Sequence, residues 1–194
     1  MKPAGYVLFA LIALVGCNPS KDVEPAAPPK TETATTAPKT EPPKTTPAPA
    51  VDEHANADRA FQLKDLETKT VKVNGKPIQV WVMDTGQKRQ EGMMFLTAKD
   101  VRDDQGMIFV SPRPSQPKEE SFWMHNTILP LDIIYIGSDK SVINIQKGKP
   151  QDDTQLPAAA PFLYVIELKQ GQAEKYGIKP GTKIDIPNDI ASKD

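Results

Sequence analysis

The chain has 194 residues, with 24 Lys and Arg against 25 Asp and Glu, and one cysteine. A single cysteine at position 17 excludes an internal disulfide, and it leaves the rest of the chain without a cysteine nucleophile or a thiolate zinc site. Residues 58–194 have 19 basic and 19 acidic side chains, so we expect no nucleic-acid partner that depends on a basic surface.

Residues 1–17 carry one lysine, an apolar run from Tyr6 to Val15, and the ending Leu14-Val15-Gly16-Cys17. The run is too short to span a bilayer as a helix. It resembles a bacterial lipoprotein signal that ends in a lipobox, which implies removal of residues 1–16 and acyl chains such as palmitate on Cys17. Asn18 is not the aspartate that retains some lipoproteins in the inner membrane. The resemblance therefore implies an outer-membrane lipoprotein facing the periplasm.

The segment that follows, up to residue 57, has the composition of a tether. Residues 18–57 contain nine of the 20 prolines and almost no aliphatic side chains beyond alanine, so they cannot bury enough apolar surface to fold. As a polyproline helix they would reach about 120 Å. We interpret residues 17–57 as a lipidated cysteine with a disordered tether, in which His54 is solvated.

Residues 58–194 have the length of a single domain, and their pattern predicts many short strands. The sequence Asn74-Gly75 between two alternating runs is a strong hairpin signal. A short helix is expected over Thr85–Glu91, capped by Thr85 and ended by Gly92, and one further helical turn at 171–177. The prolines after residue 110 predict a loop. Strands are expected at 68–73, 78–84, 106–110, 131–136, 141–146, 162–168 and 183–186, with an extended segment at 122–125.

This pattern predicts an all-β fold with one or two short helices, an antiparallel β-sandwich or barrel of jelly-roll type, and a domain that is monomeric. Gly-rich phosphate loops, Gly-x-Ser-x-Gly elbows and His-x-x-x-His pairs are absent from the sequence. We therefore expect no cofactor and no metal.

The best candidate site is the stretch Ser121–Ile136. Along an extended chain, Trp123 and His125 share one face. Asp132 would share a strand face with two isoleucines, where a carboxylate is costly unless it is hydrogen-bonded. We expect His125, Asn126 and Trp123 to serve it across the turn. The alternative is that Asp132 only ties down the turn and Trp123 fills the core.

Two further acids are candidates. Glu120 precedes the stretch, and Glu167 stands in an apolar strand, where burial would raise its pKa. The alternative for Glu167 is a salt bridge at a strand edge. Met93 and Met94 are expected to fill the core.

Four segments share a distinctive pattern, namely Arg89–Met94, Gly106–Val110, Ser121–Ile136 with its Phe-Trp-Met, Asn-Thr and Pro-Leu-Asp-Ile elements, and Val165–Leu168 with Gly171. Together they resemble the uncharacterised bacterial and archaeal family DUF192. The resemblance covers about residues 64 to 186. His125 replaces the family's usual basic residue, lysine. The family implies a compact β-sandwich and supplies no established activity.

Two hypotheses about function follow. The first is a non-catalytic envelope module, anchored through Cys17, that binds a small polar ligand, a glycan or an envelope protein through Trp123, His125, Asn126, Asp132, Glu120 and Glu167. The second is a hydrolase or lyase with Asp132, Glu120 or Glu167 as acid and base and His125 assisting. We favour binding, because no recognised catalytic constellation appears.

Overall fold

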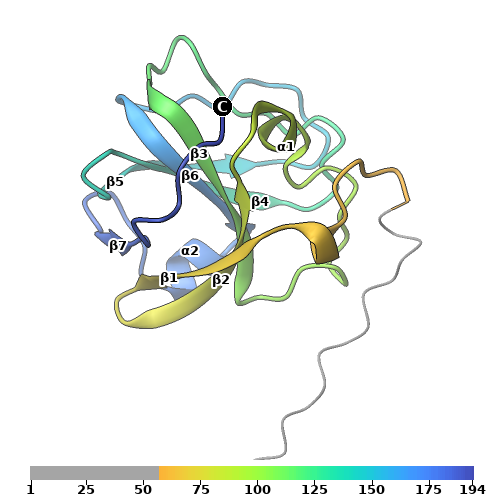
Figure 1. The fold of residues 1–194 in the computed structure, drawn as a ribbon, viewed down its shortest axis with the longest axis horizontal. Helices are drawn as coiled ribbons and strands as arrows, with labels where there is room; N and C mark the ends of the chain where they lie inside the picture. Colours follow the sequence, from red (N-terminus) through yellow and green to blue (C-terminus); the bar gives the residue numbers. More distant parts are fainter. Residues whose placement is uncertain (1–56) are drawn as a thin grey trace, which may run out of the picture. The chain divides into compact units, whose positions relative to one another are not determined.

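The computed structural model describes residues 57–194, which form a β-rich unit (Figure 1). The predicted signal, Cys17, His54 and all of the predicted tether before residue 57 lie outside these residues. In the described part of the chain, no helix is both long and apolar enough to cross a membrane.

Seven strands form one curled sheet in the order β5-β4-β6-β3-β2-β1-β7. The sheet is accompanied by one 3-10 turn, η2, and two short helices. The elements in chain order are η2 (Leu63–Asp65), β1 (Thr68–Val73), β2 (Lys76–Met83), α1 (Gly86–Glu91), β3 (Gln105–Ser115), β4 (Leu131–Ile136), β5 (Val142–Gly148), β6 (Phe162–Lys169), α2 (Gln172–Lys175) and β7 (Ile184–Asp185).

The prediction of a mostly β fold with one or two short helices is confirmed. The pairing differs from a fully antiparallel sandwich, because β2 and β3 pair in parallel within a single curled sheet. The chain between Met83 and Gln105, which includes α1, is long enough to return to the starting end of β2, as a parallel pair requires.

The first hairpin and the first helix of the domain form where the local sequence predicts them. Asn74 and Gly75 have φ of 50° and 77°, the left-handed values that a two-residue hairpin between β1 and β2 needs. The Thr85 side chain accepts a hydrogen bond from the Lys88 N–H, and Gly92 ends α1 with φ of 46°. Both predictions for this helix are confirmed.

The prediction that a loop begins after residue 110 is wrong. β3 continues to Ser115 through Pro112 and Pro114. Its pairing with β6 shifts between Val110 and Ser115, so the two prolines stand where the strand has no partner across the ladder. A missing N–H costs nothing at such unpaired positions.

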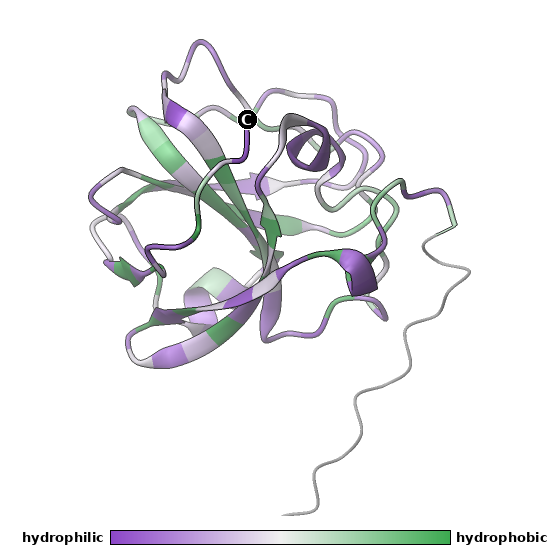
Figure 2. Ribbon diagram, viewed as in Figure 1, coloured by the Kyte–Doolittle hydropathy of each residue, from purple (hydrophilic) through white to green (hydrophobic). Residues whose placement is uncertain are grey.

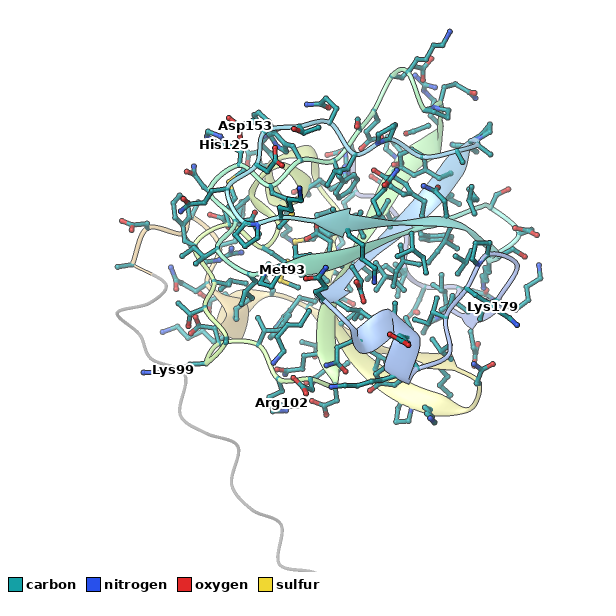
Figure 3. All side chains as sticks on the ribbon, turned by 180° about the vertical axis from the view of Figure 1, so that it is seen from behind. Met93, Lys99, Arg102, His125, Asp153 and Lys179 are labelled. Carbon is teal, nitrogen blue, oxygen red and sulfur yellow. The ribbon has the colours of Figure 1, made fainter. Side chains whose placement is uncertain are left out.

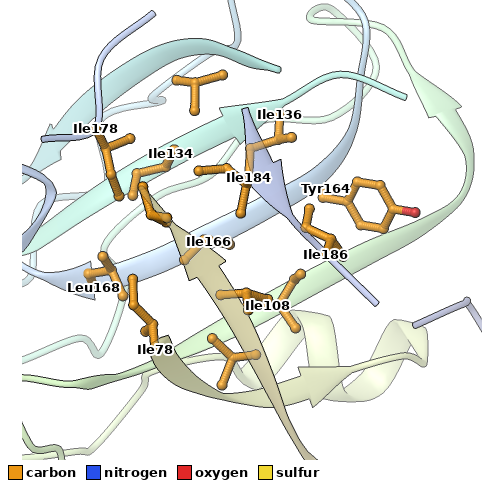
Figure 4. Packing of buried hydrophobic residues seen from close by; sticks show 14 of the residues in the cluster. Ile78, Ile108, Ile134, Ile136, Tyr164, Ile166, Leu168, Ile178, Ile184 and Ile186 are labelled. Atoms are coloured by element: carbon orange, nitrogen blue, oxygen red, sulfur yellow. The ribbon is translucent and has the colours of Figure 1, made fainter. Parts of the chain in front are cut away.

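The sheet buries side chains on both faces, which separates two cores. One face contributes Ile78, Ile108, Ile134 and Ile166 to a β-branched core (Figure 4). Ala173 of α2 and Ile184 of β7 pack into the same core. The other face packs an aromatic and methionine-rich core beneath α1 and the loops. Figure 2 colours α1 purple, as expected for a hydrophilic helix, while green residues gather on the strands in the middle of the domain. The alternation predicted for β4 is therefore confirmed, with Ile133 and Ile134 in different cores.

Candidate functional site

The central stretch enters the fold as an extended segment that crosses the methionine-rich face. Met124 is fully buried, whereas Trp123 on the opposite side is 36% exposed. The Trp123 and His125 rings stack with centroids 4.8 Å apart and an interplanar angle of 19°. The predicted shared face is confirmed, and the alternative that Trp123 fills the core is wrong.

His125 lies at the surface and has a partner that the sequence did not reveal. Its Nδ1 is 2.9 Å from Oδ1 of Asp153, in the long loop after β5. Figure 3 shows the two side chains next to each other at the edge of the molecule. The pair fixes the imidazole against Trp123, so these three side chains form one polar and aromatic rim.

Asn126 shapes the turn after this segment. Its φ is 53°, a conformation that asparagine tolerates better than most residues. Its backbone carbonyl accepts the Phe95 N–H at 2.9 Å, which ties the turn to the loop after α1. The predicted turn is confirmed, and the contribution that we see comes from the Asn126 backbone.

Asp132 is not served by the residues expected to serve it. The carboxylate is completely buried on the face of β4 that packs against α2. One oxygen accepts from Lys147 Nζ at 2.6 Å, and the other accepts the N–H groups of Gly171 and Ala173, each at 2.9 Å. Strand alternation directs the carboxylate away from Trp123, His125 and Asn126. One oxygen is used by Lys147 on β5 and the other by the start of α2, so Asp132 has a structural role. That role differs from the expected one, because the carboxylate does not tie down the turn at residues 126–127.

Glu167 has the opposite environment. It stands on β6, which lies between β4 and β3, and its register partners are Met107 and Ile133. The residue is 4% exposed, and its Oε2 has no hydrogen-bond partner among the described residues. Burial raises the pKa of this carboxyl to about 8, an effect that the charge of Arg59 partly opposes. The expected effect of burial is confirmed, and the strand-edge alternative is wrong.

Arg59 is a buried residue of this region that sequence reasoning missed. Its guanidinium donates to the carbonyls of Gly92 and Met94 at 2.8 and 2.6 Å, and it pairs with Glu91 at 3.2 Å. The Glu91 carboxylate also accepts the N–H groups of Ala60 and Phe61. No sequence pattern marks Arg59, because all of these partners lie about 30 residues away along the chain.

A small hollow of about 30 Å³ reaches Glu167 from the α1 side. It has room for one water-sized group. Its eleven lining residues are Arg89, Gln90, Glu91, Gly92, Met93, Met94, Phe109, Phe122, Trp123, Thr127 and Glu167. We call it the inner pocket.

An outer hollow of about 260 Å³ adjoins the inner pocket. The two share four lining residues, namely Arg89, Gln90, Phe122 and Trp123. Glu120 lines the outer hollow, where its carboxylate accepts from the hydroxyls of Ser111 and Ser115. The structure thus brings Trp123, Glu120 and Glu167 to two adjoining hollows and leaves Asp132 on the far face of the sheet. His125 lines neither hollow and is connected to them only through its stacking on Trp123.

Arg89 lines both hollows, but its charge is already matched. Its guanidinium pairs with the Asp194 carboxylate at 2.5 Å and donates to the Val110 carbonyl at 3.1 Å. The same carboxylate accepts the Gly86 N–H at the start of α1. This arrangement holds α1 over the pocket.

The structure separates Asp132 from the other two acids of the catalytic hypothesis. Asp132 and Glu167 lie on opposite faces of the sheet, so they cannot act together on one substrate. Within residues 57–194, no three His, Cys, Asp or Glu side chains are grouped so that they could hold a metal ion.

Comparison with known proteins identifies a family and two solved structures. The family model DUF192, described as "Uncharacterized ACR", matches residues 69–186. A crystal structure of a protein of unknown function from Novosphingobium aromaticivorans DSM 12444 is 35% identical, with a TM-score of 0.58 over 71% of this chain and 99% of that one. A protein from Sinorhizobium meliloti 1021, described as a "putative transcription regulator", is 25% identical, with a TM-score of 0.56 over 61% of this chain and 93% of that one. No curated protein matches the chain.

Proposed function

The chain belongs to the DUF192 family, and from this premise we propose that its β domain is a ligand-binding module of the bacterial cell envelope. The proposed ligand is a small polar molecule or a glycan, held in the inner pocket and the outer hollow. The proposed chain has a signal at residues 1–16, a lipidated Cys17 with a tether to residue 57, and the binding domain at 58–194. The lipid would hold the domain at the outer membrane, facing the periplasm.

One observation carries the binding proposal, namely that Glu167 is a buried carboxyl with an unpartnered oxygen beside a hollow. Leaving a buried polar atom unpaired costs about 1 to 3 kcal/mol, so folding alone gives no reason to keep it there. A ligand that supplies the missing partner would recover this free energy. Strongly perturbed acids in clefts are typical of functional sites.

The composition of the pocket supports the same proposal. All eleven residues that line the inner pocket come from the four segments that resemble the DUF192 signature. Residues so far apart in sequence converge on one hollow, whereas Asp132, which is also in the signature, serves the fold on the other face. The signature therefore combines one structural element with one pocket.

The description of the Sinorhizobium protein as a regulator does not favour DNA binding here. The equal number of 19 basic and 19 acidic residues in 58–194 supplies no net positive charge to attract phosphate groups. The pocket is also framed by the acids Glu120 and Glu167, neither of which offers a positive charge to a phosphate group.

The test is a thermal-shift screen of the full chain in detergent against sugars, glycan fragments and polar metabolites. A ligand at a hundred times its Kd should add about 2.7 kcal/mol of stability. We expect the shift to disappear in Glu167→Gln and to persist in Glu174→Gln, a matched control on the exposed surface of α2. A ligand whose shift is equal in both variants would show that binding occurs elsewhere, and the proposed site would be wrong.

A further inference from the structure

The chemistry of the pocket points to one class of ligand. We infer that the ligand carries a small ammonium group, which the Glu167 carboxylate binds in the inner pocket beside the rings of Phe109, Phe122 and Trp123. This inference rests on the proposed function and specifies the ligand of the same site.

The first argument is the balance of charge around the pocket. Both nearby arginines are already paired with carboxylates, Arg59 with Glu91 and Arg89 with Asp194. In the described part of the chain, neither Glu120 nor Glu167 forms an ion pair with a lysine or arginine; Glu120 is held by two serine hydroxyls. The charge that would complement this site is therefore positive.

The second argument is the aromatic lining. The Phe109 and Phe122 rings meet edge to face with centroids 5.0 Å apart, and Trp123 completes the wall shared by the inner pocket and the outer hollow. Ring faces attract ammonium groups, most strongly where water is excluded. A carboxylate combined with aromatic walls is a suitable environment for an amine, and repels an anion.

The third argument is size. The inner pocket, at about 30 Å³, has room for one group the size of a water molecule, and an ammonium group is of this size. The outer hollow, at about 260 Å³, can hold the rest of a small amine. Gly92 keeps the inner pocket open, because a Cβ at this position would lie 3.1 Å from the Phe109 ring and 3.7 Å from Glu167 Oε2.

Binding of an ammonium group should be coupled to release of a proton. Since burial holds the pKa of Glu167 at about 8, the carboxyl is protonated at neutral pH and must ionise to pair with the cation. Four other titratable or charged groups surround it: Arg59, whose positive charge lowers the pKa of Glu167, Tyr135, a neutral phenol, and Arg89 and Glu91, which line the pocket. The two arginines are paired, and burial raises the pKa of Tyr135, so Glu167 is the group expected to titrate.

The experiment compares n-butylamine with 1-butanol, which have the same shape and differ in one polar group. The affinity of the full chain for each is measured by chemical-shift titration from pH 6 to pH 9. We expect butylamine to bind and butanol to bind much more weakly. The affinity for butylamine should rise about 50-fold between pH 6 and pH 8 and then level off, because only the ionised carboxylate pairs with the amine. Glu167→Gln should abolish the preference, and Glu174→Gln should keep it.

Two results would overturn the inference. One is equal or tighter binding of butanol, with an affinity that falls above pH 8, as expected if a protonated Glu167 donates to a neutral oxygen. The other is no binding of butylamine up to the millimolar range. In either case the proposed function would still stand if a neutral ligand from the thermal-shift screen depended on Glu167. It would fail only if no ligand did. The pH profile is measured on the unmodified chain, so it does not depend on how any variant folds.

Discussion

Asp132 and Glu167 stand one residue out of register on the paired strands β4 and β6, and they project from opposite faces of the sheet. One carboxylate receives two backbone N–H groups and a lysine, while the other has an oxygen with no partner. Two acids that look alike in sequence therefore have opposite energetic roles. The first stabilises the fold, and the second costs stability at the candidate site.

The cost at Glu167 predicts how stability depends on pH. The folded-state pKa is raised from 4.5 to about 8, so the unfolded chain loses its proton first. The contribution of Glu167 to the free energy of unfolding is therefore highest below pH 4.5, where the group is protonated in both states. It declines as the pH rises, and the stability that depends on the protonated group is lost above about pH 8. Glu167→Gln should match the wild type near pH 4.5 and exceed its stability at pH 9 by about 5 kcal/mol, as measured by urea unfolding. Equal pH dependence of the two proteins would contradict this assignment.

Asp132→Asn should lower the stability of the fold, whereas Glu167→Gln should raise it at high pH. The amide keeps one acceptor, and its NH₂ group must face either the Lys147 ammonium or the Gly171 and Ala173 N–H groups, so we expect a loss of about 1 to 3 kcal/mol at neutral pH. Binding at the pocket should not change, because the sheet separates the two sites. Urea unfolding and a ligand titration on the same variant check both parts, and a lost affinity in a folded variant would place Asp132 in the binding site.

Trp123 should report on binding by fluorescence. The chain has two tryptophans, of which Trp81 is 6% exposed and Trp123 is 36% exposed at the outer hollow. We expect a pocket ligand to shift or quench the Trp123 emission and to protect it from acrylamide. Trp123→Phe should remove the ligand-dependent signal and leave the emission of a buried Trp81. A signal that survives in this variant would mean that the ligand binds away from the proposed wall.

The contacts of Arg59 limit how far the chain can be shortened from its N-terminal side without loss of stability. A fragment that begins at residue 57 should keep the melting temperature of the full chain. A fragment that begins at Gln62 loses the Arg59 contacts with Gly92 and Met94 and leaves Glu91 without its partner. We expect that fragment to be less stable by about 3 to 5 kcal/mol, as for a broken buried pair. Equal thermal unfolding of the two fragments would show that these contacts are not needed.

The proposed lipid anchor has a direct test. Cys17→Ser should abolish labelling with an acyl-chain probe and move the protein from the membrane fraction to the soluble fraction, because several acyl chains together give stable anchoring. Ser20→Ala, a small change three residues further along, serves as the control and should leave both properties unchanged. Membrane fractionation that is the same for the Cys17 variant would refute the lipobox interpretation.

The sequence by itself determined the features that depend on near neighbours in the chain. Asn74-Gly75 requires left-handed backbone and so set the first hairpin, and Thr85 and Gly92 set the ends of α1. Period-two alternation placed Ile133 and Ile134 on opposite faces of their strand, and it placed Trp123 beside His125. In each case the interaction involved lies within a few residues.

Only the tertiary structure decided what each carboxylate meets. The sequence could mark Asp132 and Glu167 as acids in apolar strands, but it could not tell that β6 pairs between β3 and β4, or that α2 and Lys147 would reach one acid and leave the other unpaired. Arg59 and Asp153 were missed for the same reason, since their partners lie about 30 residues away. Strand order and loop closure depend on the free energy of the whole packed chain, which no local pattern encodes.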